Sequence, residues 1–254
     1  MSGALVFARK EFFEIFRTWR IVVLPAIVLL FALTGPLLAR YTPELLTAVA
    51  GSQLSGLELP TPTVFDSYGQ WIKNLSQIGI FAIIIIYAGL VSSERRSGTA
   101  ILVLTKPLSR ATFVIVKAAV HALYLTVLAG IGTSITWGVS ALVFSEAPGA
   151  ALWSASAVWL VLALVYLALM TLFSVLIRSS AGASGAGLGA FLVLSVAGLW
   201  PPLADYSPAG LLGRAGALAS GTVSERLTWP IVISLLASLA LVGLAAMIFR
   251  RQEL

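Results

Sequence analysis

Six long apolar stretches that contain no Asp, Glu, Lys or Arg divide this sequence. They are Ile21–Ala39, Leu75–Ser93, Ala118–Phe144, Leu152–Ile177, Ser179–Trp200 and Trp229–Phe249. Each is close to, or longer than, the ~20 residues that a helix needs to cross ~30 Å of hydrocarbon. We therefore expect an all-α integral membrane protein in which residues 21–254 form a domain of six transmembrane helices.

A shorter amphipathic segment precedes the first apolar stretch. Within residues 5–19, four apolar residues share one helical face: Phe12, Ile15, Phe16 and Trp19. The charged residues assigned to this helix are Arg9, Lys10, Glu14 and Arg17, the last three on the opposite face. Residues 1–20 are predicted to form an interface helix, with its aromatic side among lipid headgroups. Its charged face either faces the cytoplasm alone or also contacts a partner there.

Basic residues concentrate in every second connecting segment. With the N-terminus inside, residues 1–20, 94–117, 178 and 250–254 hold twelve Lys and Arg, whereas 40–74, 145–151 and 201–228 hold four. The positive-inside rule therefore predicts that both termini are cytoplasmic.

Two external segments follow from this topology. Residues 40–74 are rich in turn formers and are expected to form an irregular or briefly helical external cap. Residues 201–228 contain the Gly-, Ala- and Leu-rich run 209–219. This run is either an ordinary surface loop or a re-entrant helix, which is tolerated in a membrane only when it packs against protein.

Composition excludes several kinds of site. Charged residues make up 10% of the chain and the mean hydropathy is +1.00, whereas soluble domains carry about 25% charged residues. There is no cysteine and only one histidine, His121, so no metal site is predicted and a thiol nucleophile is excluded. Because the net charge of +6 lies beside the spans, nucleic acid is not an expected partner.

The spans also lack the ionisable group with which an ion-driven carrier binds its coupling ion. His121 is the one titratable side chain within a span other than tyrosine. The third helix, counted from Val114 to Phe144, is about 46 Å long at ~1.5 Å per residue, so its first turns should protrude into the cytoplasm and carry Lys117. Energy is therefore expected to arrive from outside the spans.

The connecting segment 94–117 carries the most specific pattern. Its charges precede the apolar run Ala100–Leu104, which is too short to span a membrane and needs a cover of lipid or protein. Such a short apolar helix framed by charges fits a groove on a soluble partner. The chain has no G-x-x-x-x-G-K-[ST] loop with which to bind ATP phosphates itself.

At these residues the chain resembles the ABC-2 type permeases of ABC transporters. Glu94-x-x-x-Gly98-Thr99, followed by Leu104, Pro107, Ser109-Arg110 and Lys117, is similar to that family's first cytoplasmic loop. Residues 8–17 are similar to its membrane-entry helix. The resemblance implies two six-span subunits paired with two cytoplasmic ATPase subunits, which bind ATP and Mg²⁺, so that this chain needs no cofactor of its own. The chain departs from the family in one respect, because its external stretch between spans one and two, residues 40–74, is larger.

The resemblance also assigns roles to residues. Segment 94–117 becomes a coupling loop that docks on the ATPase, and the residues assigned to it are Glu94, Arg95, Arg96, Gly98, Thr99, Ile101, Leu102, Leu104, Pro107, Ser109 and Arg110. Spans two and five would line the pathway, and their candidate lining residues are Gln77, Tyr87, Ser184 and Ser195. Each of these four residues could instead serve helix packing. Gly185 and Gly189 form a GxxxG motif, suited either to packing within one chain or to a dimer seam.

These observations predict a permease subunit in a bacterial or archaeal plasma membrane. It would export amphipathic or lipophilic cargo as a dimer, most simply a homodimer, with separate ATPase subunits. The alternative is a membrane scaffold that anchors a cytoplasmic protein without transport. An intramembrane enzyme is poorly supported, because no span carries a pair of carboxylates.

Overall fold

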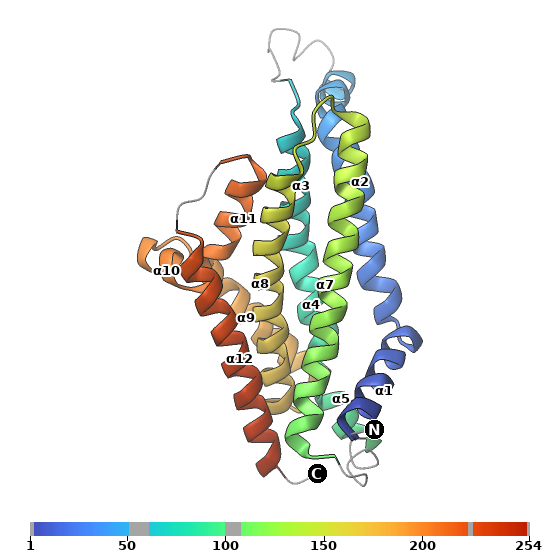
Figure 1. Ribbon diagram of the computed structural model, residues 1–254, viewed down its shortest axis with the longest axis vertical. Helices are drawn as coiled ribbons and strands as arrows, with labels where there is room; N and C mark the ends of the chain where they lie inside the picture. Colours follow the sequence, from blue (N-terminus) through green and yellow to red (C-terminus); the bar gives the residue numbers. More distant parts are fainter. Residues whose placement is uncertain (1–2, 51–60, 100–107, 223–225, 253–254) are drawn as a thin grey trace.

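The computed structural model describes residues 3–50, 61–99, 108–222 and 226–252, and in these residues it contains helices and no strand. The helices run mostly along one long axis (Figure 1). They are α1 (Gly3–Arg17), α2 (Arg20–Ala50), α3 (Val64–Asn74), α4 (Ile80–Tyr87), α5 (Ser92–Arg96), α7 (Arg110–Val143), α8 (Gly149–Leu176), α9 (Ser180–Ala197), α10 (Pro201–Tyr206), α11 (Leu211–Ala219) and α12 (Thr228–Arg251). A π-helical turn, η2 (Leu75–Gly79), joins α3 to α4, and a 3-10 turn, η3 (Pro208–Gly210), precedes α11.

Six helical stretches of the described chain are long and apolar enough to cross a membrane. They are Arg20–Ala48, Val64–Arg96, Arg110–Val143, Gly149–Leu176, Ser180–Ala197 and Thr228–Arg251. The predictions of an all-α class and of six spanning helices are therefore confirmed. The start of α1 and the end of α12 lie at the same end of the bundle (Figure 1). That this end faces the cytoplasm remains a prediction.

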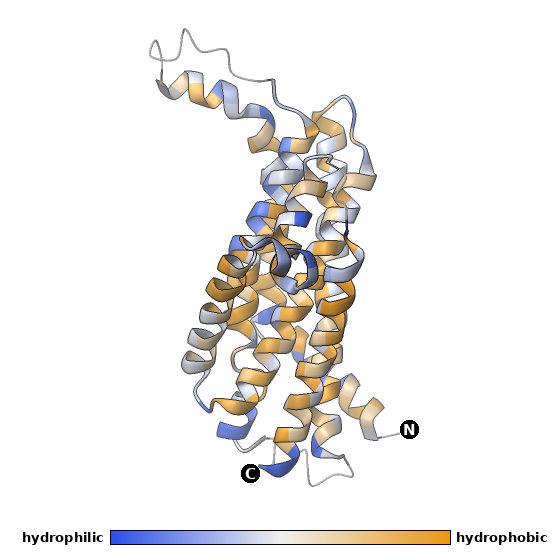
Figure 2. Cartoon of the chain, turned by 90° about the vertical axis from the view of Figure 1, so that its left-hand side faces the viewer, coloured by the Kyte–Doolittle hydropathy of each residue, from blue (hydrophilic) through white to orange (hydrophobic). Residues whose placement is uncertain are grey.

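The described residues of the predicted cap, 40–50 and 61–74, are mostly helical, which exceeds the irregular or briefly helical structure expected for 40–74. Helix α2 continues to Ala50 and passes through Pro43, and the second span begins at Val64, eleven residues before the predicted start of the span. The Asp66 carboxylate accepts hydrogen bonds from the backbone N–H of Thr63 at 2.7 Å and from its hydroxyl at 2.9 Å, which fixes the start of α3. The last turns of α2 project away from the bundle (Figure 2). Residues 51–60 of the predicted cap lie outside the described chain.

The core is built around the second and fourth spans. In each, 72% of the most apolar window is buried within the protein, against 11–33% for the other four spans. Glycine allows the closest approach in this core: a Cβ added to Gly132 of α7 would lie 2.5 Å from the Val28 side chain and 2.7 Å from Trp71. The outer helices keep apolar faces exposed, as a hydrocarbon solvent requires. Hydrophobic residues, orange in Figure 2, predominate along the helices of the bundle.

The segment between α9 and α12 folds into short helices beside the bundle. Helix α11 packs against α8 and buries Leu211, Ala215 and Ala219. The Arg214 guanidinium, which is 9% exposed, lies 2.8 Å from the Asp205 carboxylate and closes the turn between α10 and α11. Its depth in a membrane, and therefore the re-entrant topology, remains a prediction.

Candidate functional site

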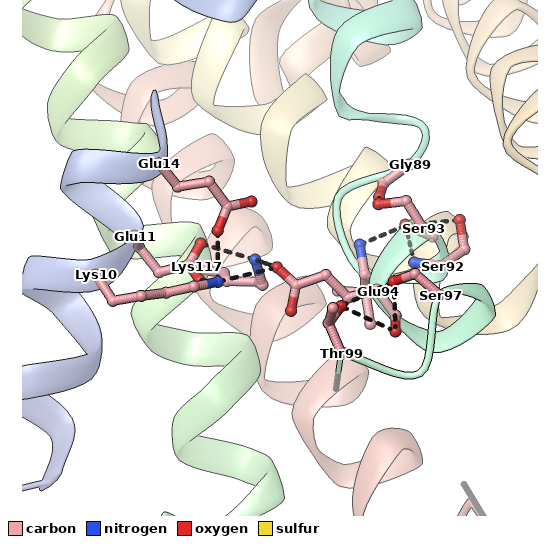
Figure 3. A network of polar contacts seen from close by, with 12 residues as sticks. Lys10, Glu11, Glu14, Gly89, Ser92, Ser93, Glu94, Ser97, Thr99 and Lys117 are labelled. Carbon is pink, nitrogen blue, oxygen red and sulfur yellow. Dashed lines mark hydrogen bonds and ion pairs between the residues drawn. The ribbon is translucent and has the colours of Figure 1, made fainter. Parts of the chain in front are cut away.

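Five charged side chains meet in one cluster (Figure 3), at the end of the bundle that carries both termini (Figure 1). The Lys117 Nζ atom on α7 lies 2.7 Å from Glu11 Oε2 on α1 and 2.6 Å from Glu94 Oε1 on α5. The Lys10 Nζ atom lies 2.9 Å from Glu11 Oε1 and 3.4 Å from Glu94 Oε1, and it also pairs with Glu14. We call these five residues the charge network. It joins three helices that are far apart in sequence.

The centre of the charge network is buried. The Lys117 and Glu11 side chains are each 1% exposed, and the Lys117 ammonium lies 5.3 Å from the centroid of the Phe113 ring and 6.0 Å from that of Phe7. Phe113 stacks in turn on Phe249 of α12, with ring centroids 5.5 Å apart. Burying a charge is costly unless it is paired at good geometry, and removing one partner leaves the full desolvation penalty. The pairing therefore fixes α1, α5 and α7 relative to one another.

The outer part of the charge network shows the same mutual support. Burial lowers the pKa of Lys10, but hydrogen bonds to Glu14 and Glu11 outweigh it and raise that pKa above its ordinary value. Burial raises the pKa of Glu14, but the hydrogen bond from Lys10 and the charge of Lys117 outweigh it and lower that pKa. Both groups are therefore charged at neutral pH.

Three carboxylates lie close enough together to invite comparison with a metal site. Oxygen atoms of Glu11, Glu14 and Glu94 lie within 4.8 Å of one another. The ammonium groups of Lys10 and Lys117 already contact these oxygens. The cluster is therefore arranged as an ion-pair network, with both cations supplied by the protein.

Helix α5, which begins the predicted coupling loop, is also fixed from its other side. The Ser174 hydroxyl of α8 accepts hydrogen bonds from the backbone N–H groups of Val91, at 2.8 Å, and Ser92, at 3.0 Å. Arg95 donates to the Val175 carbonyl at 3.1 Å, and Arg96 donates to the Ser180 hydroxyl at 2.9 Å. The end of the second span is thus attached to α8 and to the start of α9.

The ends of the neighbouring helices meet in the same region. The Ser109 hydroxyl accepts a hydrogen bond from the Thr112 N–H at 3.0 Å and so caps the N-terminus of α7. Arg110 donates to the carbonyl of Gln252, and the Gln252 side chain donates to the Val175 carbonyl at 3.2 Å. The helices α7, α8 and α12 therefore converge on the base of α5.

These contacts change how several predicted coupling residues are interpreted. Glu94 is 8% exposed and turned inward, and Arg95, Arg96 and Arg110 donate hydrogen bonds within the chain rather than being wholly free for a partner. Gly98 has a φ of +74°, in the left-handed region that favours glycine, and the Thr99 hydroxyl donates to the Glu94 carbonyl at 3.4 Å. The remaining predicted residues, Ile101, Leu102, Leu104 and Pro107, lie outside the described part of the chain.

Lys117, on the turns of α7 that were expected to protrude into the cytoplasm, is 1% exposed and is covered by α1 and α5. Its position relative to a membrane remains a prediction. The interface helix also differs from its prediction. Phe12, Phe16 and Trp19 are exposed as expected for a lipid-facing side, but Ile15 is buried against the bundle. Lys10 and Glu14 pair within the charge network, whereas Arg9 lies over the Phe13 ring at 5.6 Å and Arg17 is exposed.

Sequence reasoning did not assign roles to Glu11 and Ser174. Glu11 could have been noticed, because Phe7, Glu11 and Ile15 recur every four residues and form the face of α1 that packs on the bundle. Nothing local distinguishes Ser174 from the other serines of the spans.

The four candidate pathway residues do not come together in this conformation. Tyr87 is fully buried and meets His121 edge to face, with ring centroids 5.0 Å apart. Gln77 is exposed and Ser184 is half-buried. Ser195 lines a cavity of about 240 Å³ together with Ser76 and Tyr166.

Comparison with known proteins agrees with this architecture. The family model described as "ABC-2 family transporter protein" matches residues 5–213, most of the chain. The chain is also 24% identical over 261 aligned residues to the uncharacterized transmembrane protein YxlG of Bacillus subtilis (strain 168), with 100% of this chain and 99% of that protein covered. A family match of this extent, on six spanning helices, shows that the chain belongs to the ABC-2 family of transporter proteins and is a multi-pass membrane transport component rather than a catalytic subunit.

Proposed function

We propose that this chain is the permease subunit of an ATP-driven ABC transporter of the plasma membrane. It works as a dimer with two copies of a separate cytoplasmic ATPase, which bind ATP and Mg²⁺, and it exports amphipathic or lipophilic cargo. Membership of the ABC-2 family supports a role in transport, and the charge network is the observation that supports coupling to an ATPase. Through Glu94, the network attaches the start of the predicted coupling loop to α7 at Lys117 and to α1 at Lys10. Glu11 of α1 binds the same Lys117.

The contacts suggest how force from an ATPase would reach the spans. A displacement of the loop near Gly98 acts directly on α5, which ends at Arg96. Helix α5 is in turn bound to α7 through its Glu94 and to α8 through the Ser174 hydroxyl. The same displacement acts on α7 through Lys117 and on α4 through the continuous backbone. ATP then drives transport if the ATPase dimer prefers one arrangement of these helices over the other.

The outer face of α9 supports the proposed dimer. Only 11% of the apolar window of this helix is buried, and an added Cβ on Gly185 or Gly189 would meet no atom within 4 Å. Small residues on an open face allow close backbone approach between helices in lipid, where packing drives association. A second copy would pack on this face, where the small residues are followed by the exposed side chains of Leu192 and Val196.

The proposal is tested first by asking whether a neighbouring reading frame encodes a soluble protein with a phosphate-loop motif, and then by reconstituting that protein with this chain. Co-purification, ATP hydrolysis and dye efflux are measured in reconstituted vesicles. Leu102→Asp and Gly98→Pro should abolish association and ATP-driven efflux, since the first puts a charge on the apolar run and proline cannot adopt the +74° φ of residue 98. Gly98→Asn is the matched control, because asparagine tolerates a left-handed backbone.

Intact association and efflux in both disruptive variants would refute the docking role. Association without transport-dependent ATP hydrolysis would favour the scaffold alternative. Efflux driven by a proton or sodium gradient in the absence of any ATPase would refute the proposed energy source.

A further inference from the structure

A cavity of about 240 Å³ lies among the second, fourth and fifth spans and the short helices that follow α9. Its walls are mostly apolar, with Leu162 from α8, Phe191 from α9 and Leu212 from α11. An apolar protein cavity of about 150 Å³ is enough to bind benzene. The space therefore accommodates a small apolar ligand or part of a longer chain.

The polar groups of this cavity are few and uncharged. Ser76, Tyr166 and Ser195 line it, and no Asp, Glu, Lys, Arg or His is among its described lining residues. An ion or a strongly charged headgroup would find no countercharge there, and burying it would carry a large desolvation penalty. The lining favours a neutral ligand.

Ser76 provides an independent indication of a ligand. It is 4% exposed, and its hydroxyl has no hydrogen-bond partner among the described residues. Serine in a membrane helix usually returns its hydroxyl to a carbonyl of the preceding turn, but Ser76 lies in the π-helical turn η2. Such turns are rare in proteins, and those that occur often lie at functional sites. A buried hydroxyl without a partner leaves a favourable hydrogen bond unmade.

Two kinds of glycine shape the wall formed by η3 and α11. A Cβ on Gly198 would lie 2.6 Å from the Ala209 carbonyl oxygen, so the end of α9 and η3 are in direct backbone contact. A Cβ on Gly213, which lines the cavity, would meet no atom within 4 Å. The wall is therefore closed at Gly198 and leaves room at Gly213. A larger side chain at residue 213 would occupy part of the cavity.

We propose that this cavity binds the alkyl chain of a neutral amphiphile, whose hydroxyl or carbonyl oxygen hydrogen-bonds to Ser76. The ligand could be a free single-chain molecule, as a cargo would be, or an acyl chain of a bilayer phospholipid. Both present the same chemistry to the cavity. Binding is a property of the permease alone and does not depend on the proposed ATPase.

The test uses the full chain in phosphatidylcholine nanodiscs without ATPase. One sample receives dodecanol carrying a diazirine group, and a parallel sample contains phosphatidylcholine with a diazirine on one acyl chain. After illumination, labelled peptides are identified by mass spectrometry. Labelling is expected in the peptides that contain Phe191–Ser195 and Leu211–Gly213, and an excess of unmodified dodecanol should reduce the labelling by the alcohol.

Matched variants separate the cavity from the surrounding lipid surface. Gly213→Leu should reduce labelling at least about tenfold by filling the space, whereas Gly216→Leu on the same helix should leave it unchanged. Residue 216 also has no atom within 4 Å of an added Cβ, but it does not line the cavity. Ser76→Ala should raise the concentration of the alcohol at half-saturation about fivefold, the usual effect of losing one neutral hydrogen bond. Ser76→Thr keeps a hydroxyl and should leave that concentration unchanged.

Labelling by the alcohol alone, lost in Gly213→Leu, supports a single-chain ligand of the cargo type. Labelling by the phospholipid with the same sensitivity also supports the site and identifies a bilayer lipid as its occupant. Equal labelling of wild type and Gly213→Leu by both probes overturns the proposal. If Gly213→Leu does not fold, an unchanged half-saturation in Ser76→Ala overturns it instead.

Discussion

Replacing Lys117 with methionine tests the charge network most directly. Methionine keeps an unbranched apolar side chain of nearly the same length but removes the ammonium group. In the wild type this group lies 2.7 Å from Glu11 and 2.6 Å from Glu94, and its side chain is 1% exposed. The substitution therefore leaves two carboxylates in a buried site without their main counterion.

The expected cost can be estimated from these contacts. Breaking a buried ion pair by removing one partner typically costs about 3–5 kcal/mol, because the other charge stays buried. Lys10 remains 2.9 Å from one oxygen of Glu11 and 3.4 Å from Glu94, so partial compensation favours the lower limit. About 3 kcal/mol corresponds to a fall of roughly 6–12 °C in unfolding temperature for a chain of this size.

Thermal unfolding of the detergent-solubilised protein, followed by tryptophan fluorescence, provides the measurement. Lys73→Met on the exposed side of α3 is the matched control and should change stability by no more than about 0.5 kcal/mol. The triple variant Lys117→Met, Glu11→Gln, Glu94→Gln should recover most of the loss, because it also removes the stranded charges. A fall no larger than that of Lys73→Met, or no recovery in the triple variant, would refute the electrostatic argument.

Three further predictions concern separate contacts. Ser174→Ala should lower the free energy of unfolding by about 1–3 kcal/mol and weaken ATPase binding in a pull-down, because two buried N–H groups lose their acceptor. The Ser154 hydroxyl bonds within its own helix, so Ser154→Ala should leave ATPase binding intact. Gly132→Ala should destabilise the fold by about 1–3 kcal/mol in the same unfolding assay, because its Cβ would overlap Val28 and Trp71, while Gly138→Ala, with no atom within 4 Å, should not. Because the pKa of Glu14 is lowered, its contribution to stability is present above its ordinary pKa of 4.5 and is lost as the pH falls through the folded-state value. Glu14→Gln should therefore reduce the dependence of the unfolding temperature on pH between pH 6 and pH 3. An unchanged dependence would contradict this.

The spans were predictable because hydrocarbon imposes one local rule. Every backbone polar group must be satisfied within the helix, so a sufficiently long apolar run is enough to predict a span. The stretch 40–74 was harder, because proline and glycine indicate turns in water but are tolerated in a supported helix such as α2 around Pro43. The Thr63-x-x-Asp66 pattern, which marks the start of α3, was present in the sequence and is a readable N-terminal signal.

The charge network could not be predicted from local patterns. Glu11, Glu94 and Lys117 are separated by at least 23 residues, and each sits in a segment whose charges resemble an ordinary solvated face. Only the packing of Phe7 on Phe113 and of Ser174 on the start of α5 brings them together and removes water. The hydroxyl of Ser76, which has no hydrogen-bond partner among the residues that the structure describes, was equally unpredictable, since the π-helical turn around it has no sequence signature here.

The location of the buried charges bears on where energy enters the protein. An ion-translocating site must release its charges and bind them again, but Lys117 is held by two carboxylates and two aromatic rings. Exchanging such a group with a passing ion would require water to reach a site that is closed in this conformation. A fixed joint has the opposite requirement, since it must keep its pairs while the helices it connects move together. The charge network meets the second requirement, and it therefore favours the proposed coupling through the predicted coupling loop over ion coupling within the spans.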